Sequence, residues 1–295
     1  MMQGLVFLAG AALLAGGYLA LGPLIRRLVT YTVAREARAA IQADWSVLIE
    51  QRVPAVGALT QVQRDRLLHA VRNLLRTRHW EGCGGLTLTQ DMQLTIAAQA
   101  CLLTLELPGE PYPQLRNILV YPSTFLPARA VDVRKWTHPS VSEPPLPELG
   151  EAWRTGTVVV AWDAALTGGQ NPSDGRNLVL HEFAHLIDFQ YGLARGDPDL
   201  AELLRGPRET TPAPDIPGGD TWRQVLAESF ERHCAEVEQG APALLDQYAA
   251  TNEAEFFAVG TETFFEKPAE LKAAYPQLYE HLCRFFRQDP AGQHS

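Results

Sequence analysis

The stretch VLHEFAHLID, residues 179–188, places two histidines and two acids among side chains that are typical of a protein core. In an α-helix, residues i and i+4 lie on the same face, so His181 and His185 would face the same space. Burying these groups and the neighbouring Glu182 costs several kcal/mol unless they are hydrogen-bonded, paired or bound to a metal. The stretch therefore predicts a buried helix organised around a polar site.

The polar residues of this stretch form the pattern H-E-x-x-H, which is typical of zinc peptidases. Neutral imidazole suits zinc, and a catalytic zinc usually takes three protein ligands and keeps a fourth position for water. The metal lowers the pKa of that water towards 7, and Glu182 is placed to accept the proton as general base. His181 and His185 are thus predicted metal ligands. The alternative is a pair of structural histidines satisfied by hydrogen bonds, which the apolar setting disfavours.

A third ligand is required, and the residues leave more than one choice. Glu228 and Glu231 lie on a predicted helix, where either could equally be solvated or ion-paired. Glu255 precedes an apolar helical face, where a carboxylate requires a cation, and spacing favours it modestly. Tyr248, seven residues earlier, could donate its hydroxyl to the oxyanion of a tetrahedral intermediate. The alternative for Tyr248 is a core tyrosine with a satisfied hydroxyl.

Segments flanking the motif also predict functional roles. The β-branched run Thr157–Trp162 predicts a strand which, at a sheet edge, could hold an extended peptide by strand addition; an internal strand is the alternative. Gly168, Gly169 and Gly175 are expected in a loop that leaves room for this peptide. Asp188 could orient a ligand histidine from behind, or it could cap the helix.

The pattern of helices and strands predicts an α+β fold, mostly helical with a small sheet. The chain has 295 residues and is 46% hydrophobic, which is enough to bury a full core. We expect an apolar segment over residues 1–33 and one catalytic domain over residues 34–290. The expected helices are Ala34–Val53, Leu59–Arg78, 87–105 with Thr89 as its cap, and a helical region Thr221–Phe286 with breaks at Pro268 and Pro276; the expected strands are Asn117–Tyr121 and Thr157–Trp162.

The N-terminus carries no charge from Gly4 to Ile25, and this length is enough to cross a bilayer once as a helix. Arginines follow the apolar run, which by the positive-inside rule leaves the bulk of the chain in the cytoplasm. The sequence therefore predicts a protein anchored to the cytoplasmic face of the inner membrane. The alternative is an apolar helix that packs on the domain.

Composition excludes some partners. The formal net charge is −9 and the sequence pI is about 5.4, without a basic stripe interleaved with aromatic residues, so nucleic acid is not an expected partner. The four cysteines, at positions 83, 101, 234 and 283, are widely spaced and form no C-x-x-C pair. We therefore expect reduced thiols rather than a disulfide framework or a cysteine zinc site.

Several segments together resemble the Mlc titration factor A family of zinc-dependent peptidases, whose metal site is similar to that of anthrax lethal factor. The resemblance is carried by HEFAHLID and YAATNEAEFFAVGTETFF and extends over roughly residues 60–290. Further similar segments are WEGCGGLTLTQDMQLTIAAQACLLTL, NILVYPSTF, GEAWRTGTVVVAWD and PQLYEHLCRFFRQDP. Together they are far more specific than H-E-x-x-H.

The resemblance implies a zincin-like fold and a role for each site residue. It implies zinc ligands at His181, His185 and Glu255, a general base at Glu182 and a transition-state role for Tyr248, and it leaves Glu228 structural. The implied activity is that of a gluzincin-type zinc metallopeptidase, with aminopeptidase activity as one form, acting on a peptide or protein substrate. The alternative is a regulatory binding protein that sequesters a transcriptional repressor such as Mlc, with peptidase activity secondary.

Overall fold

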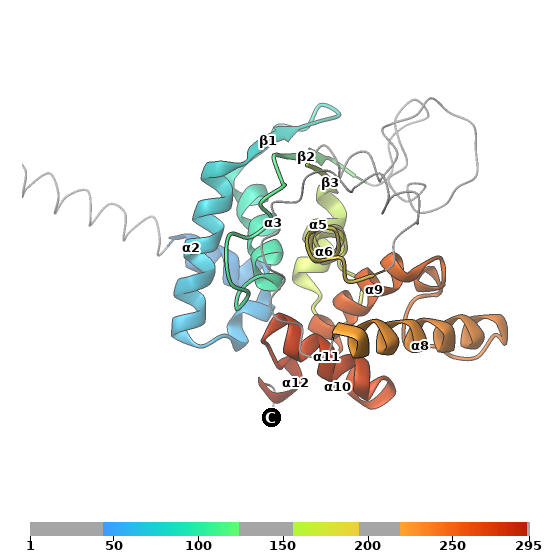
Figure 1. The fold of residues 1–295 in the computed structure, drawn as a ribbon. Helices are drawn as coiled ribbons and strands as arrows, with labels where there is room; N and C mark the ends of the chain where they lie inside the picture. Colours follow the sequence, from blue (N-terminus) through green and yellow to red (C-terminus); the bar gives the residue numbers. More distant parts are fainter. Residues whose placement is uncertain (1–43, 124–155, 195–218, 294–295) are drawn as a thin grey trace, which may run out of the picture. The chain divides into compact units, whose positions relative to one another are not determined.

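The computed structural model describes residues 44–123, 156–194 and 219–293 (Figure 1). Leu48–Ser295 form one compact unit. The predicted anchor at residues 4–25 lies outside the described residues, as does the proline-rich segment 138–150. Among the helices that the structure does describe, none has the length and apolar character needed to cross a bilayer. The anchor therefore stays a prediction.

The first two described helices are separated at Pro54, where the sequence predicts a break. Residues 44–52 are helical, and the 3-10 helix η1 (Pro54–Ala58) interrupts the chain at the predicted proline. Helix α2 (Gln61–Thr77) begins with a capping box, in which the Thr60 and Gln63 side chains each bond the other residue's backbone N–H. Such reciprocal bonds satisfy donors that a helix start leaves without partners.

A three-stranded parallel sheet lies beside these helices. Strands β1 (His79–Gly82) and β3 (Thr157–Ala161) both pair with β2 (Asn117–Tyr121), in the order β1-β2-β3. Asn117 of β2 is in register with His79 and Thr157. Four of the five β3 residues are buried, as expected for a parallel strand that is covered on both faces. The described residues are mostly helical and contain one small sheet, which confirms the predicted α+β fold.

Helices α3 (Gln90–Leu103) and α5 (Trp162–Gln170) pack against each other. This packing shows that the predicted glycine loop beside the substrate strand is wrong for two of its three glycines. Gly168 and Gly169 do not lie in an open loop, because both are buried within α5. A Cβ at Gly169 would come within 2.9 Å of Gln99 Nε2 on α3, and one at Gly168 within 3.0 Å of Asn177 Cα. These glycines therefore permit close helix packing rather than the approach of a substrate. Thr89 caps α3, as predicted.

Helix α6 (Leu178–Tyr191) carries the H-E-x-x-H residues and is surrounded by other elements. Asn177 caps its start by accepting the Leu180 N–H, and Gly192 ends it in the left-handed conformation at φ 64°. Helix α6 contacts α3, α5, β3 and the C-terminal helix α9 (Glu253–Glu266), and Figure 1 shows it near the centre of these elements. Its residues from Val179 to Asp188 are all buried, so the predicted buried helix is confirmed.

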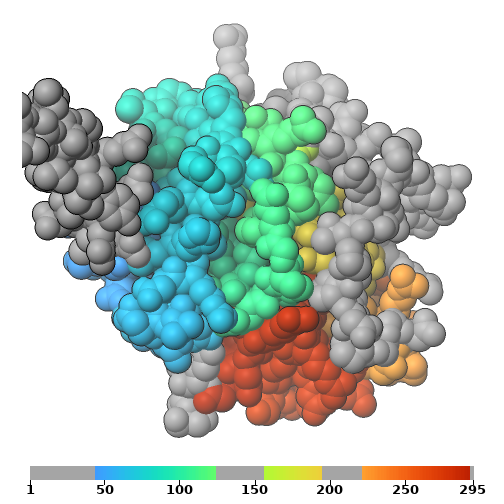
Figure 2. Space-filling model, turned by 60° about the vertical axis from the view of Figure 1, so that its left-hand side comes forward, coloured from blue at the N-terminus to red at the C-terminus, as the bar shows by residue number. Residues whose placement is uncertain are grey.

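The C-terminal region is helical with breaks at the predicted prolines. Helix α8 (Gly219–Glu238) is followed by the 3-10 helix η3 (Gln247–Ala250) and then by α9. Pro268 and Pro276 occupy the first turns of α10 (Pro268–Ala274) and α11 (Pro276–Phe286), and α12 spans Pro290–Gln293. Figure 2 shows the C-terminal helices against the N-terminal part of the unit, where Gln288 Nε2 donates to the Leu102 carbonyl over 3.0 Å.

Candidate metal centre

Three potential ligand atoms converge between α6 and α9. His181 Nε2 lies 3.0 Å from Glu255 Oε2 and 3.1 Å from His185 Nε2, and the remaining pair, His185 Nε2 and Glu255 Oε2, is separated by 3.4 Å. All three residues are buried. They form the one group of histidine, cysteine and acidic side chains with metal-ligand spacing among the residues that the structure describes.

The donor set fits a tetrahedral zinc ion. Zinc bonds of about 2.0–2.2 Å to nitrogen and oxygen would hold neighbouring ligand atoms roughly 3.3–3.6 Å apart. The three separations here, 3.0, 3.1 and 3.4 Å, are close to this range. Two imidazole nitrogens and a carboxylate oxygen cannot face one another without a proton or a cation between them. Since three protein donors leave a fourth position, the set is of the catalytic rather than the closed structural type.

The pKa shifts of the three residues also indicate that the group requires a positive charge between its ligand atoms. Burial disfavours the charged form of His181, but hydrogen bonds with two glutamates hold its pKa well above the ordinary value. Burial lowers the pKa of His185. Burial also opposes ionisation of Glu255, yet its hydrogen bonds with His181 and His185 hold its pKa well below the usual range. A buried carboxylate that stays ionised beside two imidazoles would attract a divalent cation, which would displace the shared proton.

Glu182 and Tyr248 lie beside this group. Glu182 is buried on α6, directly after the first histidine. Tyr248, on η3, is half-buried with its ring centroid 6.0 Å from that of His181. Burial raises the pKa of Tyr248, and so do the charge of Glu255, a hydrogen bond with it and the charge of Glu182. The structure therefore brings all five predicted site residues together.

One residue of the site, Glu262 on α9, was not among the sequence predictions. Its Oε1 lies 2.8 Å from His181 Nδ1, and its Oε2 accepts the Asn177 N–H over 2.5 Å. Glu262 follows Glu255 by seven residues, which returns a helix to nearly the same face. That spacing from a predicted ligand was the signal that could have identified it.

A third buried carboxyl of α9, that of Glu266, also contacts Asn177. Its Oε1 accepts a hydrogen bond from the Asn177 side-chain amide over 3.1 Å, while its buried Oε2 lacks a close hydrogen-bond partner among the described residues. Burial raises the pKa of Glu266 to about 8, and the charge of Glu262 adds to the effect. Glu266 is therefore largely protonated at neutral pH.

This raised pKa predicts a dependence of stability on pH. Between the ordinary pKa of glutamate and about 8, the folded state binds a proton that the unfolded state releases, so Glu266 makes stability fall as pH rises. In Glu266→Gln this contribution disappears, and the variant should gain on the order of a few kcal/mol relative to wild type from pH 5 to pH 9. Urea unfolding of both metal-free proteins across this range measures the difference, and parallel pH profiles would contradict the assignment.

The remaining candidate residues from the sequence lie outside the metal group. Glu228 is exposed on α8 and accepts a hydrogen bond from Gln224, and Glu231 is also exposed, so neither joins the metal group. Asp188 Oδ1 accepts the Ala194 N–H over 2.6 Å, just past the end of α6. Of its two predicted roles, the capping role is therefore the one that its contacts support.

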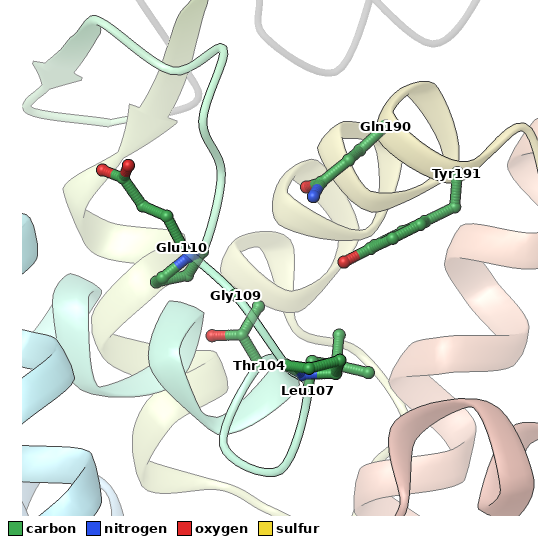
Figure 3. Close-up of a pocket in the computed structure, with 8 residues that line it drawn as sticks. Thr104, Leu107, Gly109, Glu110, Gln190 and Tyr191 are labelled. Carbon is green, nitrogen blue, oxygen red and sulfur yellow. The ribbon is translucent and has the colours of Figure 1, made fainter. Parts of the chain in front are cut away.

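A small pocket at the C-terminal end of α6 is separate from these residues (Figure 3). Gln190 and Tyr191 project from α6 towards the loop that carries Leu107 and Gly109. The volume open to the centre of a water molecule is about 10 Å³, which is room for roughly one water. None of the predicted site residues lines it, so this pocket is distinct from the candidate metal centre.

A buried helix with two histidines that face a glutamate of a neighbouring helix is the arrangement of a metallohydrolase. Comparison with known proteins agrees: residues 28–287 match the family model described as glucose-regulated metallo-peptidase M90. The chain belongs to this metallopeptidase family, as the resemblance found in the sequence had predicted. Membership implies a metal ion, for which the His181, His185 and Glu255 group is the candidate site.

Individual relatives cover most of the chain. Mlc titration factor A of Yersinia pestis (strain Pestoides F) is 30% identical over 263 residues, which are 87% of this chain and 88% of the relative. The protein of the same name from Yersinia pseudotuberculosis serotype O:1b gives the same values. An uncharacterized protein of Synechocystis sp. is 35% identical over 250 residues, 83% of this chain and 84% of that protein.

Proposed function

We propose that this protein is a zinc-dependent peptidase that hydrolyses peptide bonds with metal-activated water. The convergence of His181, His185 and Glu255 beside Glu182 and Tyr248 is the observation that carries the proposal. The three converging residues are the proposed zinc ligands, which makes the site gluzincin-type. Membership of a metallopeptidase family supports the reaction class.

Each remaining side chain has a role in the proposed reaction. When bound, zinc supplies a Lewis acid that polarises the scissile carbonyl and acidifies water. Glu182 accepts the proton of the attacking water and later passes it to the leaving amine. The raised pKa of Tyr248 keeps its hydroxyl protonated at neutral pH, so that it can donate to the developing oxyanion.

The substrate is proposed to bind as an extended chain along β3. Within the described sheet, this strand is the last in the order β1-β2-β3, and it contacts α6. Backbone hydrogen bonds from such a strand would orient a peptide without regard to most of its side chains. Peptides with N-methylated backbone amides are the test, because their KM should rise sharply in this binding mode. Unchanged KM values would contradict it.

Tyr248→Phe tests the role of the phenol. We expect kcat to fall by about 10²-fold, the scale of losing one oxyanion donor, with a small change in KM because the ring remains. Steady-state kinetics of zinc-loaded wild-type and variant proteins measure the two constants. Tyr275→Phe, which removes a hydroxyl bonded to Glu236 away from the site, is the matched control. Equal kcat values for wild type and Tyr248→Phe would remove Tyr248 from the mechanism.

The proposed reaction itself is tested with peptides. The full chain, loaded with zinc, is incubated with peptides of mixed sequence, some with acetylated N-termini, and the products are identified by mass spectrometry. Release of single N-terminal residues from free peptides only would define an aminopeptidase, and internal cleavage would define an endopeptidase. No cleavage of any peptide by protein that holds one zinc per chain would contradict peptidase activity.

A second candidate function is supported by the name of the Yersinia relatives, Mlc titration factor A. In this reading the protein sequesters a transcriptional repressor of the Mlc type, and peptidase activity is secondary. Titration calorimetry of the full chain with purified Mlc tests it. Micromolar or tighter binding that is independent of zinc would favour this function, whereas the absence of heat would disfavour it.

A further inference from the structure

The two oxygens of Glu262 join the proposed ligand His181 to the start of its own helix. Oε1 lies 2.8 Å from the ring Nδ1 of His181, and Oε2 accepts the N–H of Asn177, the residue that caps α6, over 2.5 Å. Glu262 comes from α9, the helix that also supplies Glu255. One side chain thus fixes a ligand ring and the first turn of α6 relative to the helix of the third ligand.

The two contacts determine which ring nitrogen of His181 carries a proton. The Asn177 backbone N–H can only donate, so Oε2 must accept. When Glu262 is ionised, Oε1 can only accept as well, from a proton on Nδ1. Nε2, the atom that faces Glu255 and His185, is consequently the nitrogen available to a metal. Carboxylates placed behind metal-bound histidines generally fix the ring in this manner.

We infer that Glu262 is a positioning residue, which holds His181 in the orientation and proton arrangement that direct Nε2 to the metal. The inference rests on the proposed function, because it requires His181 to be a metal ligand. Glu262 does not touch the reacting atoms and acts through the His181 ring.

Substitution by glutamine separates this role from simple packing. In Glu262→Gln the amide oxygen must face the Asn177 N–H, so the amide NH₂ group faces His181 Nδ1. Two donors would then oppose each other when Nδ1 is protonated, and the ring would favour its proton on Nε2, the nitrogen that the metal needs. Zinc affinity should therefore fall about 10- to 100-fold, the usual effect of losing such a partner.

Glu266→Gln is the matched control. Glu266 lies on the same helix and is equally buried. It also bonds Asn177, but it accepts from the side-chain amide of Asn177 rather than from the backbone N–H. This bond is with Asn177 and not with the His181 ring, whose hydrogen bonds within the described residues are with Glu262, Glu255 and His185. Its carboxyl is already largely neutral at pH 7. Its zinc affinity should remain within about twofold of wild type, since the ring partner is retained.

The experiment measures zinc dissociation constants of the full chain and both variants by competition with a chromophoric chelator at pH 7. In parallel, ¹H–¹⁵N spectra of the zinc-loaded wild type locate the ring proton of His181. We expect weaker binding in Glu262→Gln only, partial recovery in Glu262→Asp, and a hydrogen-bonded proton on Nδ1. If Glu262→Gln does not fold, the wild-type spectrum and Glu262→Asp decide the question.

Equal zinc affinities for Glu262→Gln and Glu266→Gln would overturn the positioning role, as would zinc coordination through Nδ1 of His181. Failure of the proposed function has a different signature. A wild-type protein that binds no zinc would remove both proposals, whereas tight zinc binding in all variants would remove only the role of Glu262.

Discussion

Replacing Glu182 by glutamine is expected to lower kcat about 10²- to 10⁴-fold, the range that general acid–base catalysis supplies. The amide cannot accept a proton from water, although it has nearly the same size as the carboxylate. Glu182 directly follows His181 on α6, and its charge raises the pKa of Tyr248, so it lies beside the metal group. It is not one of the three converging residues. Zinc content, measured by metal analysis of the same samples, should therefore remain at one ion per chain.

Glu228→Gln provides the control for this substitution, because Glu228 is exposed on α8 and contacts Gln224. Its kcat and zinc content should equal those of wild type. Loss of zinc from Glu182→Gln would show that Glu182 is a ligand, and the assignment of roles would then be wrong. Retention of full activity would show that another group accepts the proton.

Replacing Glu255 by alanine is expected to weaken zinc binding by more than about 100-fold, which exceeds the usual effect of losing a residue behind a ligand. The substitution removes the single carboxylate that faces both histidines, at 3.0 and 3.4 Å. It also leaves Nε2 of His181 and Nε2 of His185 facing each other over 3.1 Å without the carboxylate that they share, although Glu262 still bonds Nδ1 of His181. Chelator competition measures the affinity, and activity at limiting zinc should fall in parallel.

The outcome of Glu255→Ala also tests the choice of third ligand. Zinc affinity that survives this change but falls in Glu228→Ala would mean that the ligand has been misassigned. Thermal unfolding of the metal-free proteins shows whether the substitution also damages the fold. A variant that folds normally and loses only its zinc-dependent stabilisation is the expected result, because a metal stabilises the state that binds it.

Much of the helical organisation could be predicted because it depends on local chemistry. Proline fixes φ and lacks an N–H, so the breaks at Pro54, Pro268 and Pro276 could be located from the sequence. The buried helix was predictable because polar residues at i and i+4 within an apolar run require a shared partner. The third ligand required the resemblance, since spacing favours Glu255 over Glu228 and Glu231 only modestly.

Other features depend on contacts between distant segments and could not be predicted. Strand β1 was missed, because HWEG lacks the β-branched run that marks β2 and β3. Gly168 and Gly169 suggest a loop in sequence, but close packing of α5 against other elements places them in a helix. Glu262 lies 81 residues from His181, and the packing of α9 on α6 brings the two together.

The most direct test of the proposed zinc peptidase is removal and return of the metal. The full chain is treated with a chelator, freed of it by dialysis and titrated with zinc while peptide hydrolysis is followed. The account predicts that activity disappears with the metal and returns in full at one equivalent of zinc. Hydrolysis that persists in protein shown to be metal-free would contradict it, as would protein that takes up one zinc and still cleaves no peptide.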